Sequence, residues 1–245
     1  MIIDERMAVF IDSLDKGNTP FLNEIEKYAL ETRVPIVRKS MQSLLKFLLA
    51  FSKPKNILEV GTAVGFSALL MDEYSPEGCH ITTIEKYEKR IPLARENFRR
   101  AGAEDRITLL EGDALELLGQ LPGTYDFIFM DAAKGQYGSF LPDILGLLQP
   151  GGLLVSDNVL QDGDIMESRF AVTRRNRTIH ARMREYLYDL KHHPLLETVV
   201  LPVGDGVTVS LRREEPAESV CKEPAGRTGG ADVEECPGQR VFEEQ

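Results

Sequence analysis

Two short segments of the chain contain oxygen-bearing side chains, and one of these segments also contains a lysine. The first contains Asp131 and Lys134, and the second contains the pair Asp157-Asn158. Two carboxylates and an amide supply three oxygen ligands, which suit a hard divalent cation such as Mg²⁺. A lone aspartate after a strand often only caps the next helix, but three such groups beside a lysine favour a metal site. The two segments therefore predict a site for a hard divalent cation.

These two segments each follow a short apolar run that is typical of a buried strand. Similar runs occur earlier and alternate with amphipathic stretches. We therefore expect strands at 56–60, 80–84, 107–110, 125–130 and 152–156, followed by helices from Gly65 and at 86–101, 114–118, 137–148 and 178–191. We also expect three helices at 4–16, 20–31 and 38–51, and a final hairpin of strands 196–201 and 206–211 around Gly204-Asp205-Gly206.

Five strand–helix units predict an α/β, Rossmann-like fold with a doubly wound sheet. The expected sheet has seven strands and is mostly parallel, with an antiparallel C-terminal hairpin and helices at the N-terminus. Ligands in such sheets bind beyond the carboxyl ends of the strands. The residues directly after each strand are therefore the candidates for binding and catalysis.

The turn after the first expected strand contains Gly61 and Gly65. Their G-x-x-x-G spacing differs from the G-x-G-x-x-G of dinucleotide sites and disfavours an NAD-dependent oxidoreductase. Glu85 ends the second strand, 24 residues after Gly61, where an acid can accept hydrogen bonds from both hydroxyls of a ribose. After the third strand, Asp113 and Ala114 offer an acceptor and a small apolar neighbour, which suit the rim of an adenine pocket.

Together these features resemble the S-adenosylmethionine-dependent methyltransferase fold, whose first motif is similar to the segment from Glu59 to Gly65. The resemblance implies that the methionine half of the cofactor contacts Gly61 and Ser67, and that Glu85 binds the ribose. The full set of cofactor-binding residues that it implies is Val34, Glu59, Gly61, Ser67, Glu85, Asp113, Ala114 and Asp131.

The pairing of Asp-x-x-Lys with Asp-Asn closely resembles the cation-dependent O-methyltransferase family, over about residues 30 to 213. This resemblance implies that Asp131, Asp157 and Asn158 hold Mg²⁺ or another hard divalent cation. It also implies that Lys134 is the catalytic base, with Asp131 beside it in the catalytic machinery. A deprotonated hydroxyl would then attack the sulfonium methyl in line.

A basic run containing Arg174, Arg175 and Arg177 follows the second metal segment. Arginines bind phosphates well, and the run resembles the bacterial branch that methylates 5-hydroxyuridine at the wobble position of tRNA. tRNA is therefore the substrate that the sequence favours. A small catechol-like phenol is the alternative within enzymes, and a noncatalytic RNA- or metal-binding module is the alternative of another class.

The net charge of −10 excludes a uniformly basic nucleic-acid binder but not a local basic surface. Residues 214–245 carry −6 of it and are rich in Gly, Pro and Glu, so we expect an acidic disordered tail after one domain at 1–213, with 1–52 as a helical cap. The three scattered cysteines, the lack of a long apolar run and the acidic N-terminus predict a cytoplasmic protein. The family resemblance also implies a homodimer, with helices 4–16 and 20–31 as the expected interface.

Overall fold

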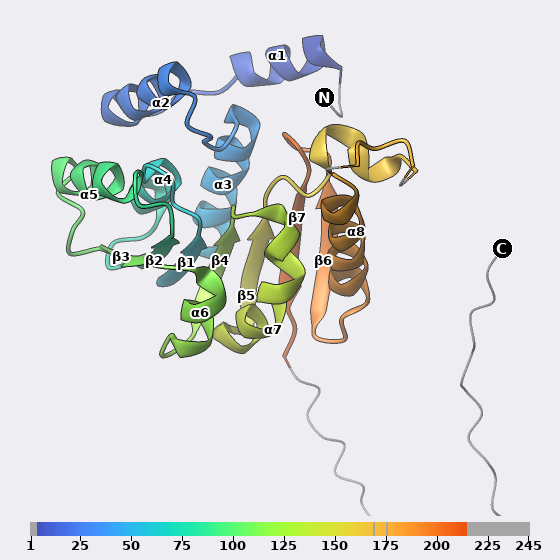
Figure 1. The fold of residues 1–245 in the computed structure, drawn as a ribbon. Helices are drawn as coiled ribbons and strands as arrows, with labels where there is room; N and C mark the ends of the chain where they lie inside the picture. Colours follow the sequence, from blue (N-terminus) through green and yellow to red (C-terminus); the bar gives the residue numbers. More distant parts are fainter. Residues whose placement is uncertain (1–3, 169, 175, 215–245) are drawn as a thin grey trace, which may run out of the picture. The chain divides into compact units, whose positions relative to one another are not determined.

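A seven-stranded sheet forms the centre of the protein, as the computed structural model shows for residues 4–168, 170–174 and 176–214 (Figure 1). The strands are β1 (Asn56–Val60), β2 (His80–Glu85), β3 (Ile107–Glu111), β4 (Tyr125–Met130), β5 (Leu148–Ser156), β6 (Leu196–Leu201) and β7 (Val207–Arg212). Their order is β3-β2-β1-β4-β5-β7-β6. The strands from β3 to β5 are parallel, and β7 pairs antiparallel with both β5 and β6. The expected Rossmann-like fold with its antiparallel hairpin is confirmed.

Helices cover both faces of this sheet (Figure 1). They are α1 (Glu5–Ser13), α2 (Pro20–Thr32), α3 (Lys39–Ser52), α4 (Phe66–Tyr74), α5 (Ile91–Arg100), α6 (Ala114–Leu117), α7 (Tyr137–Leu147) and α8 (Arg177–His192). Three short 3₁₀ turns are η1 (Leu118–Gln120), η2 (Lys134–Gln136) and η3 (Gln161–Met166). The helix expected at 86–101 begins only at Ile91. The carboxylate of Glu85 accepts a hydrogen bond from the Tyr87 amide, and Pro92 lies in the first turn, where proline is tolerated.

The alternation of side chains along the strands separates two apolar cores. Ile57 and Phe127 pack with apolar residues of α2 to α5, whereas Leu58 and Ile128 pack with those of α6 to α8. Because successive residues of a strand point to opposite faces, each strand contributes to both cores. These two layers fix the sheet from both sides and leave the ends of its strands open.

Strand β5 begins at Leu148, four residues before the start that the sequence predicts. A bulge in β5 accounts for this difference: Tyr125 pairs with Leu148 and Phe127 pairs with Leu153, so the extra residues between the two pairs belong to β5. Gly151 within this bulge has φ +79°, so the backbone leaves the extended conformation there although strand pairing already begins at Leu148.

The turn between β6 and β7 packs against the loop that follows β5. The amide of Val159 donates to the carbonyl of Gly206 at 2.9 Å, and the amide of Leu160 donates to the carbonyl of Asp205 at 2.9 Å. This contact brings the C-terminal hairpin to the edge where the loops after β1, β4 and β5 emerge.

The predicted acidic tail cannot be compared with the structure, because residues 215–245, which make up nearly all of it, lie outside the described residues.

Among the described helices, none combines the length and apolar character required to cross a membrane.

Candidate active site

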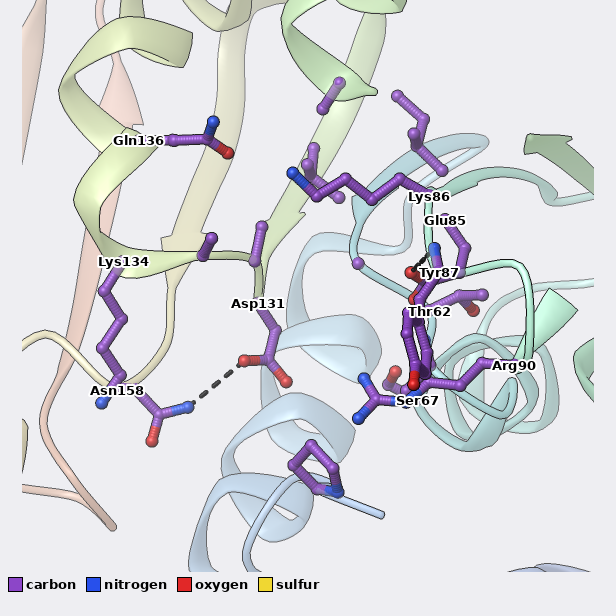
Figure 2. Close-up of a pocket in the computed structure, with 18 of the residues that line it drawn as sticks. Thr62, Ser67, Glu85, Lys86, Tyr87, Arg90, Asp131, Lys134, Gln136 and Asn158 are labelled. Atoms are coloured by element: carbon purple, nitrogen blue, oxygen red, sulfur yellow. Dashed lines mark hydrogen bonds between the residues drawn. The ribbon is translucent and has the colours of Figure 1, made fainter. Parts of the chain in front are cut away.

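A cavity of about 680 Å³ lies at the carboxyl ends of the parallel strands. Its walls include Gly61 after β1, Glu85 at the end of β2 and Asp113 after β3, together with Asp131 after β4 and Asn158 after β5. Figure 2 shows Asp131, Lys134 and Asn158 on one side of the cavity, and Glu85 with the residues that follow it on the other. One cavity is therefore lined by most of the predicted cofactor residues and by two of the three predicted metal residues.

Glu85 is held by its own surroundings. One carboxylate oxygen accepts the Ala63 amide at 2.8 Å, and the other accepts the Tyr87 amide at 2.8 Å. A carboxylate has about four acceptor positions, so each oxygen retains one for a ligand. The side chain is thus fixed in place and still able to accept hydrogen bonds from the two hydroxyls of a ribose.

The remaining residues of the predicted cofactor end also lie on the cavity wall. Ser67 lies in the first turn of α4, and Ala114 begins α6. Asp113 caps α6, where the Leu115 amide and the Lys86 ammonium hold the pKa of its carboxyl below the usual value. Gly61 has φ +99°, and a Cβ there would overlap the backbone oxygen of Asp131. That glycine therefore permits the loops after β1 and β4 to approach each other.

Two predicted cofactor residues do not line the cavity. Val34 packs against the apolar core, and its successors Pro35 and Ile36 reach the cavity instead. Glu59 is fully buried within β1 and accepts a hydrogen bond from the Thr83 hydroxyl. Burial raises the pKa of Glu59 to about 7, and hydrogen bonds from neighbouring hydroxyls offset part of this rise. The sequence motif places this acid among the cofactor residues, whereas the structure buries it behind the cavity wall.

The three predicted metal residues lie close together, but only two of them line the cavity. Asp131 and Asn158 line the cavity, and the Asn158 amide donates to Asp131 Oδ1 at 3.2 Å (Figure 2). Asp157 lies behind them at 3% exposure, and its Oδ1 accepts the Asn158 amide N–H at 2.7 Å. Burial raises the pKa of both carboxyls, and the charge of Asp131 raises that of Asp157 further.

This arrangement fits a hard divalent cation. Asp157 is buried and Asp131 is half-buried, and two carboxylates this near each other are costly to ionise together, a cost that a cation between their oxygens would remove. The Asn158 amide would have to present its oxygen rather than the N–H that now faces Asp131. Within the described ranges, no group of three or more His, Cys, Asp or Glu side chains offers another metal site.

Lys134 lies at the start of η2 and lines the cavity. Its ammonium is 3.2 Å from the carboxylate of Asp205, a residue of the β6–β7 turn that is 3% exposed. Sequence reasoning missed Asp205 as a site residue. The Gly-Asp-Gly turn carried the signal, because the hairpin places this carboxylate back at the edge of the sheet where the site lies.

The predicted substrate arginines lie outside the cavity wall where the structure describes them. The guanidinium of Arg177 donates to the Val172 carbonyl at 3.4 Å and lies 6.0 Å from the ring centre of Phe170. Arg174 is exposed, and Arg175 lies outside the described residues. Arg182 donates to the Gly135 carbonyl at 3.1 Å, so part of the basic run fastens loops of this chain.

Comparison with known proteins adds three relatives. A catechol O-methyltransferase from Niastella koreensis is 34% identical over 135 residues, which cover 54% of this chain and 61% of that protein. Caffeoyl-CoA O-methyltransferase 2 from Populus trichocarpa is 33% identical over 182 residues, which cover 69% of this chain and 71% of that protein. The crystal structure of the SAH-bound Podospora anserina methyltransferase PaMTH1 matches with 29% identity and a TM-score of 0.77, over 86% of this chain and 95% of that one.

The model of the O-methyltransferase family matches residues 12–213, which include every described residue of the cavity wall. The resemblance to O-methyltransferases that the sequence suggests is therefore confirmed at the level of the family. None of these relatives carries a tRNA-modifying name, so the branch that acts on 5-hydroxyuridine stays a prediction. The chain belongs to the O-methyltransferase family.

Proposed function

We propose that this protein transfers a methyl group from S-adenosylmethionine to one hydroxyl of a small catechol-like substrate, with the help of a divalent cation. The observation that carries the proposal is the shared cavity. Glu85 and Asp113 line one part of it, and Asp131, Lys134 and Asn158 line another. A nucleoside cofactor and an oxygen-rich substrate can therefore meet inside a single enclosure.

The cofactor end suits S-adenosylmethionine, whose sulfonium carries the methyl group as an electrophile. In this proposal Glu85 accepts hydrogen bonds from the ribose, and Asp113 with Ala114 borders the adenine. Ser67 and the open amides at the start of α4 receive the carboxylate of the methionine half, as helix N-termini commonly do for anions. The similarity to PaMTH1, whose structure contains SAH, supports this choice.

For methyl transfer, the part of the cavity after β4 and β5 must remove a proton from the substrate hydroxyl and hold the hydroxyl oxygen in line with the methyl group. A bound divalent cation lowers the pKa of a hydroxyl that it coordinates. Asp131, Asp157 and Asn158 are the residues that would hold this ion. Lys134 lies beside them on the cavity wall, and in this proposal its side chain accepts the proton in the neutral amine form, since an ammonium has no free electron pair. Most of the remaining rate enhancement would come from orientation, which the fixed strand ends supply.

The substrate assignment rests on two observations. The named relatives include a catechol and a caffeoyl-CoA O-methyltransferase, and both names indicate aromatic substrates. Arg177, one of the arginines that suggest a tRNA substrate, is engaged with Val172 and Phe170 of its own chain. Exposed Arg174 still favours tRNA as a second candidate, because 5-hydroxyuridine also has two neighbouring oxygens.

The test compares three acceptors under one set of conditions. The purified protein is incubated with S-adenosylmethionine and Mg²⁺, and with pyrocatechol, resorcinol or tRNA that contains 5-hydroxyuridine. Products are identified by mass spectrometry. Resorcinol is the matched control, because it has the same atoms with hydroxyls that are not adjacent. We expect methylation of pyrocatechol and not of resorcinol. Methylation of tRNA alone, or of none of the three, would overturn the catechol proposal.

A further inference from the structure

The strands β4 and β5 stop pairing where the two aspartates of the proposed metal site begin. Their last paired residues are Met130 and Ser156. One further backbone bond follows, in which the amide of Asp157 donates to the carbonyl of Met130 at 2.9 Å. Beyond it, the amide of Asp131 donates to the carbonyl of Val60 in β1 at 3.0 Å and not to β5. A group that joins the two strand ends at this level therefore controls how far apart the two carboxylates stand.

One side chain from a third element joins these two strand ends. The hydroxyl of Tyr137, the first residue of α7, lies 3.1 Å from the carbonyl oxygen of Asp157 and 3.2 Å from that of Met130. A phenol has a single O–H, so the two carbonyls share one donor at nearly equal distances. Because both acceptors are backbone groups, the hydroxyl acts on the chain that carries the carboxylates rather than on the carboxylates themselves.

Tyr137 is itself held in a fixed place. Its side chain is 1% exposed, and its ring packs edge-to-face against the ring of Tyr186 of α8, with 5.4 Å between the ring centres. A tyrosine is a rigid side chain, and the close packing of a protein core leaves a buried ring little room to shift. The hydroxyl therefore keeps a fixed position between α7 and the ends of β4 and β5.

The spacing of the two aspartates matters most for a small cation. Mg²⁺ requires near-octahedral geometry with oxygens at about 2.0–2.1 Å, whereas Ca²⁺ accepts more oxygens at about 2.3–2.6 Å in flexible arrangements. Groups that orient metal ligands without touching the metal commonly change its affinity by about 10–100-fold when they are removed. A fixed connection between the strand ends therefore favours the cation that tolerates the least variation in ligand position.

We propose that Tyr137 is a positioning residue that makes the site select Mg²⁺ over Ca²⁺. The inference rests on the proposed function, in which Asp131, Asp157 and Asn158 hold a divalent cation. Tyr137 is not part of the cavity wall and acts through the backbone carbonyls of Met130 and Asp157. Without its hydroxyl, the two strand ends can move apart, and the affinity for Mg²⁺ falls more than the affinity for Ca²⁺.

The test measures cation binding and not methyl transfer. Mn²⁺ bound to the full chain is followed by electron paramagnetic resonance, and Mg²⁺ or Ca²⁺ is titrated in to displace it. For Y137F, we expect the affinity for Mg²⁺ to fall about tenfold and the affinity for Ca²⁺ to fall by about threefold or less. The ratio of the two affinities should therefore fall. An unchanged ratio in folded Y137F would overturn the inference.

Y186F is the matched control. It removes a hydroxyl from the same core, but this hydroxyl bonds to the side chain of Ser156 at 2.6 Å and not to the backbone. A loss of stability alone should affect both variants, whereas the ratio of affinities should change only in Y137F. The affinity for S-adenosylhomocysteine, measured by calorimetry, should stay within about twofold in both variants. An equal change of the ratio in Y186F would show that loosening of the core is sufficient, and would overturn the role of Tyr137.

Two further outcomes separate this inference from the proposed function. A wild type that binds no Mn²⁺, or a D131A variant that binds it as well as wild type, would overturn the cation-dependent function and the inference with it. Binding that D131A abolishes, with an unchanged ratio in Y137F, would overturn the role of Tyr137 alone. If Y137F does not fold, a crystal structure of wild type with Mg²⁺ decides. A Tyr137 hydroxyl bonded to the Asp157 carbonyl would support the inference, and one more than about 3.5 Å away would overturn it.

Discussion

At the scale of single residues, Glu59 shows how burial changes a group that the sequence motif marks. It lies in the central strand β1 with none of its side chain exposed. Burial raises the pKa of Glu59 from 4.5 to about 7. The folded protein therefore holds a proton on this carboxyl at pH values where the unfolded chain has released it. Between pH 4.5 and 7, stability must fall as pH rises, because the folded state binds more protons than the unfolded state.

Glu59→Gln should remove this loss. The variant keeps a neutral side chain at every pH, so it should match wild type near pH 4.5 and exceed its free energy of unfolding by up to about 3 kcal/mol at about pH 8. Urea unfolding at the two pH values, without cofactor, measures the difference. Glu88→Gln, at an exposed position after β2, is the control. A difference between wild type and Glu59→Gln that does not change with pH would contradict this account.

Local sequence pattern identifies some residues of the site and misses others. Asp131, Lys134 and Asn158 are found from local spacing, because each follows a strand whose apolar run is easily recognised. Asp205 is not found, because its partner lies 71 residues away and only the folded hairpin joins them. Val34 is one residue away from those that reach the cavity, and neither periodicity nor composition determines which residue of a loop turns inward.

At the scale of elements, the site depends on two loops that come unusually close. Gly61 after β1 leaves no room for a side chain, because the backbone oxygen of Asp131 occupies the place of a Cβ. The metal residues and the cofactor residues therefore both depend on the absence of a side chain at Gly61. A change at Gly61 disturbs both at once, although Gly61 has no functional group of its own.

Gly61→Ala should be costly for two separable reasons. A left-handed backbone costs an alanine about 1–2 kcal/mol, and the overlap with Asp131 adds to that cost. We expect a total loss above about 3 kcal/mol in the free energy of unfolding, with loss of cofactor binding. Gly78→Ala is the matched control, because Gly78 has φ +82° and, its two chain neighbours aside, no described residue has an atom within 4 Å of the position that a Cβ would take. Equal losses at the two positions would show that close approach contributes nothing.

The arginines in and just before helix α8 differ in what they contact. Arg177 and Arg182 donate to carbonyls of neighbouring loops, whereas Arg174, just before the helix, makes no hydrogen bond or ion pair with the described part of the chain. A triple substitution of the basic run would therefore mix structural and electrostatic effects. Arg174 alone is the clean probe for phosphate binding.

Arg174→Ala should leave tRNA affinity unchanged if the substrate is a small phenol. Fluorescence anisotropy at several salt concentrations measures this, since each lost phosphate contact lowers the salt slope by about one. Arg177→Ala should instead speed hydrogen exchange around Val172, because that carbonyl loses its donor. Weaker tRNA binding with a reduced slope for Arg174→Ala would return the assignment to tRNA.

Most elements follow from periodicity, whereas some of their boundaries depend on strand pairing or on single hydrogen bonds. The core strands β1 and β4 lie where their apolar runs predict. The start of β5 depends on pairing with Tyr125, and the late start of α5 depends on the bond between Glu85 and the Tyr87 amide. Apolar pattern alone cannot report either contact, because the first is a pairing between two strands and the second is a hydrogen bond from a backbone amide to a carboxylate two residues away.

At the scale of the whole molecule, α1 contacts α3 but leaves its large apolar side chains uncovered by the described residues. It has no buried residue, and Met7, Phe10 and Ile11 are all exposed. Phe47 and Phe51 of α3 are also exposed and stack on each other with ring centres 6.2 Å apart. We propose that a second copy of the chain covers these side chains, since exposed apolar groups of this size favour association.

Phe10→Glu combined with Phe51→Glu should shift the protein from dimer to monomer. A charged side chain in an apolar interface is costly to desolvate, so association should weaken while the core stays intact. Light scattering across a concentration series measures the mass. Tyr188→Glu on α8 serves as the control, because it places the same charge at an exposed aromatic position of another helix. A wild type that is monomeric at every concentration would contradict the dimer.

The central claim is that Asp131, Asp157 and Asn158 make methyl transfer depend on a divalent cation. The direct measurement is the rate of pyrocatechol methylation in excess chelator and after Mg²⁺ is restored. Wild type should lose about a hundredfold or more in rate and then recover, whereas Asp131→Ala and Asp157→Ala should stay inactive in both conditions. Asp189→Ala, at an exposed position on α8, should behave as wild type. Full activity of wild type in excess chelator would contradict the account.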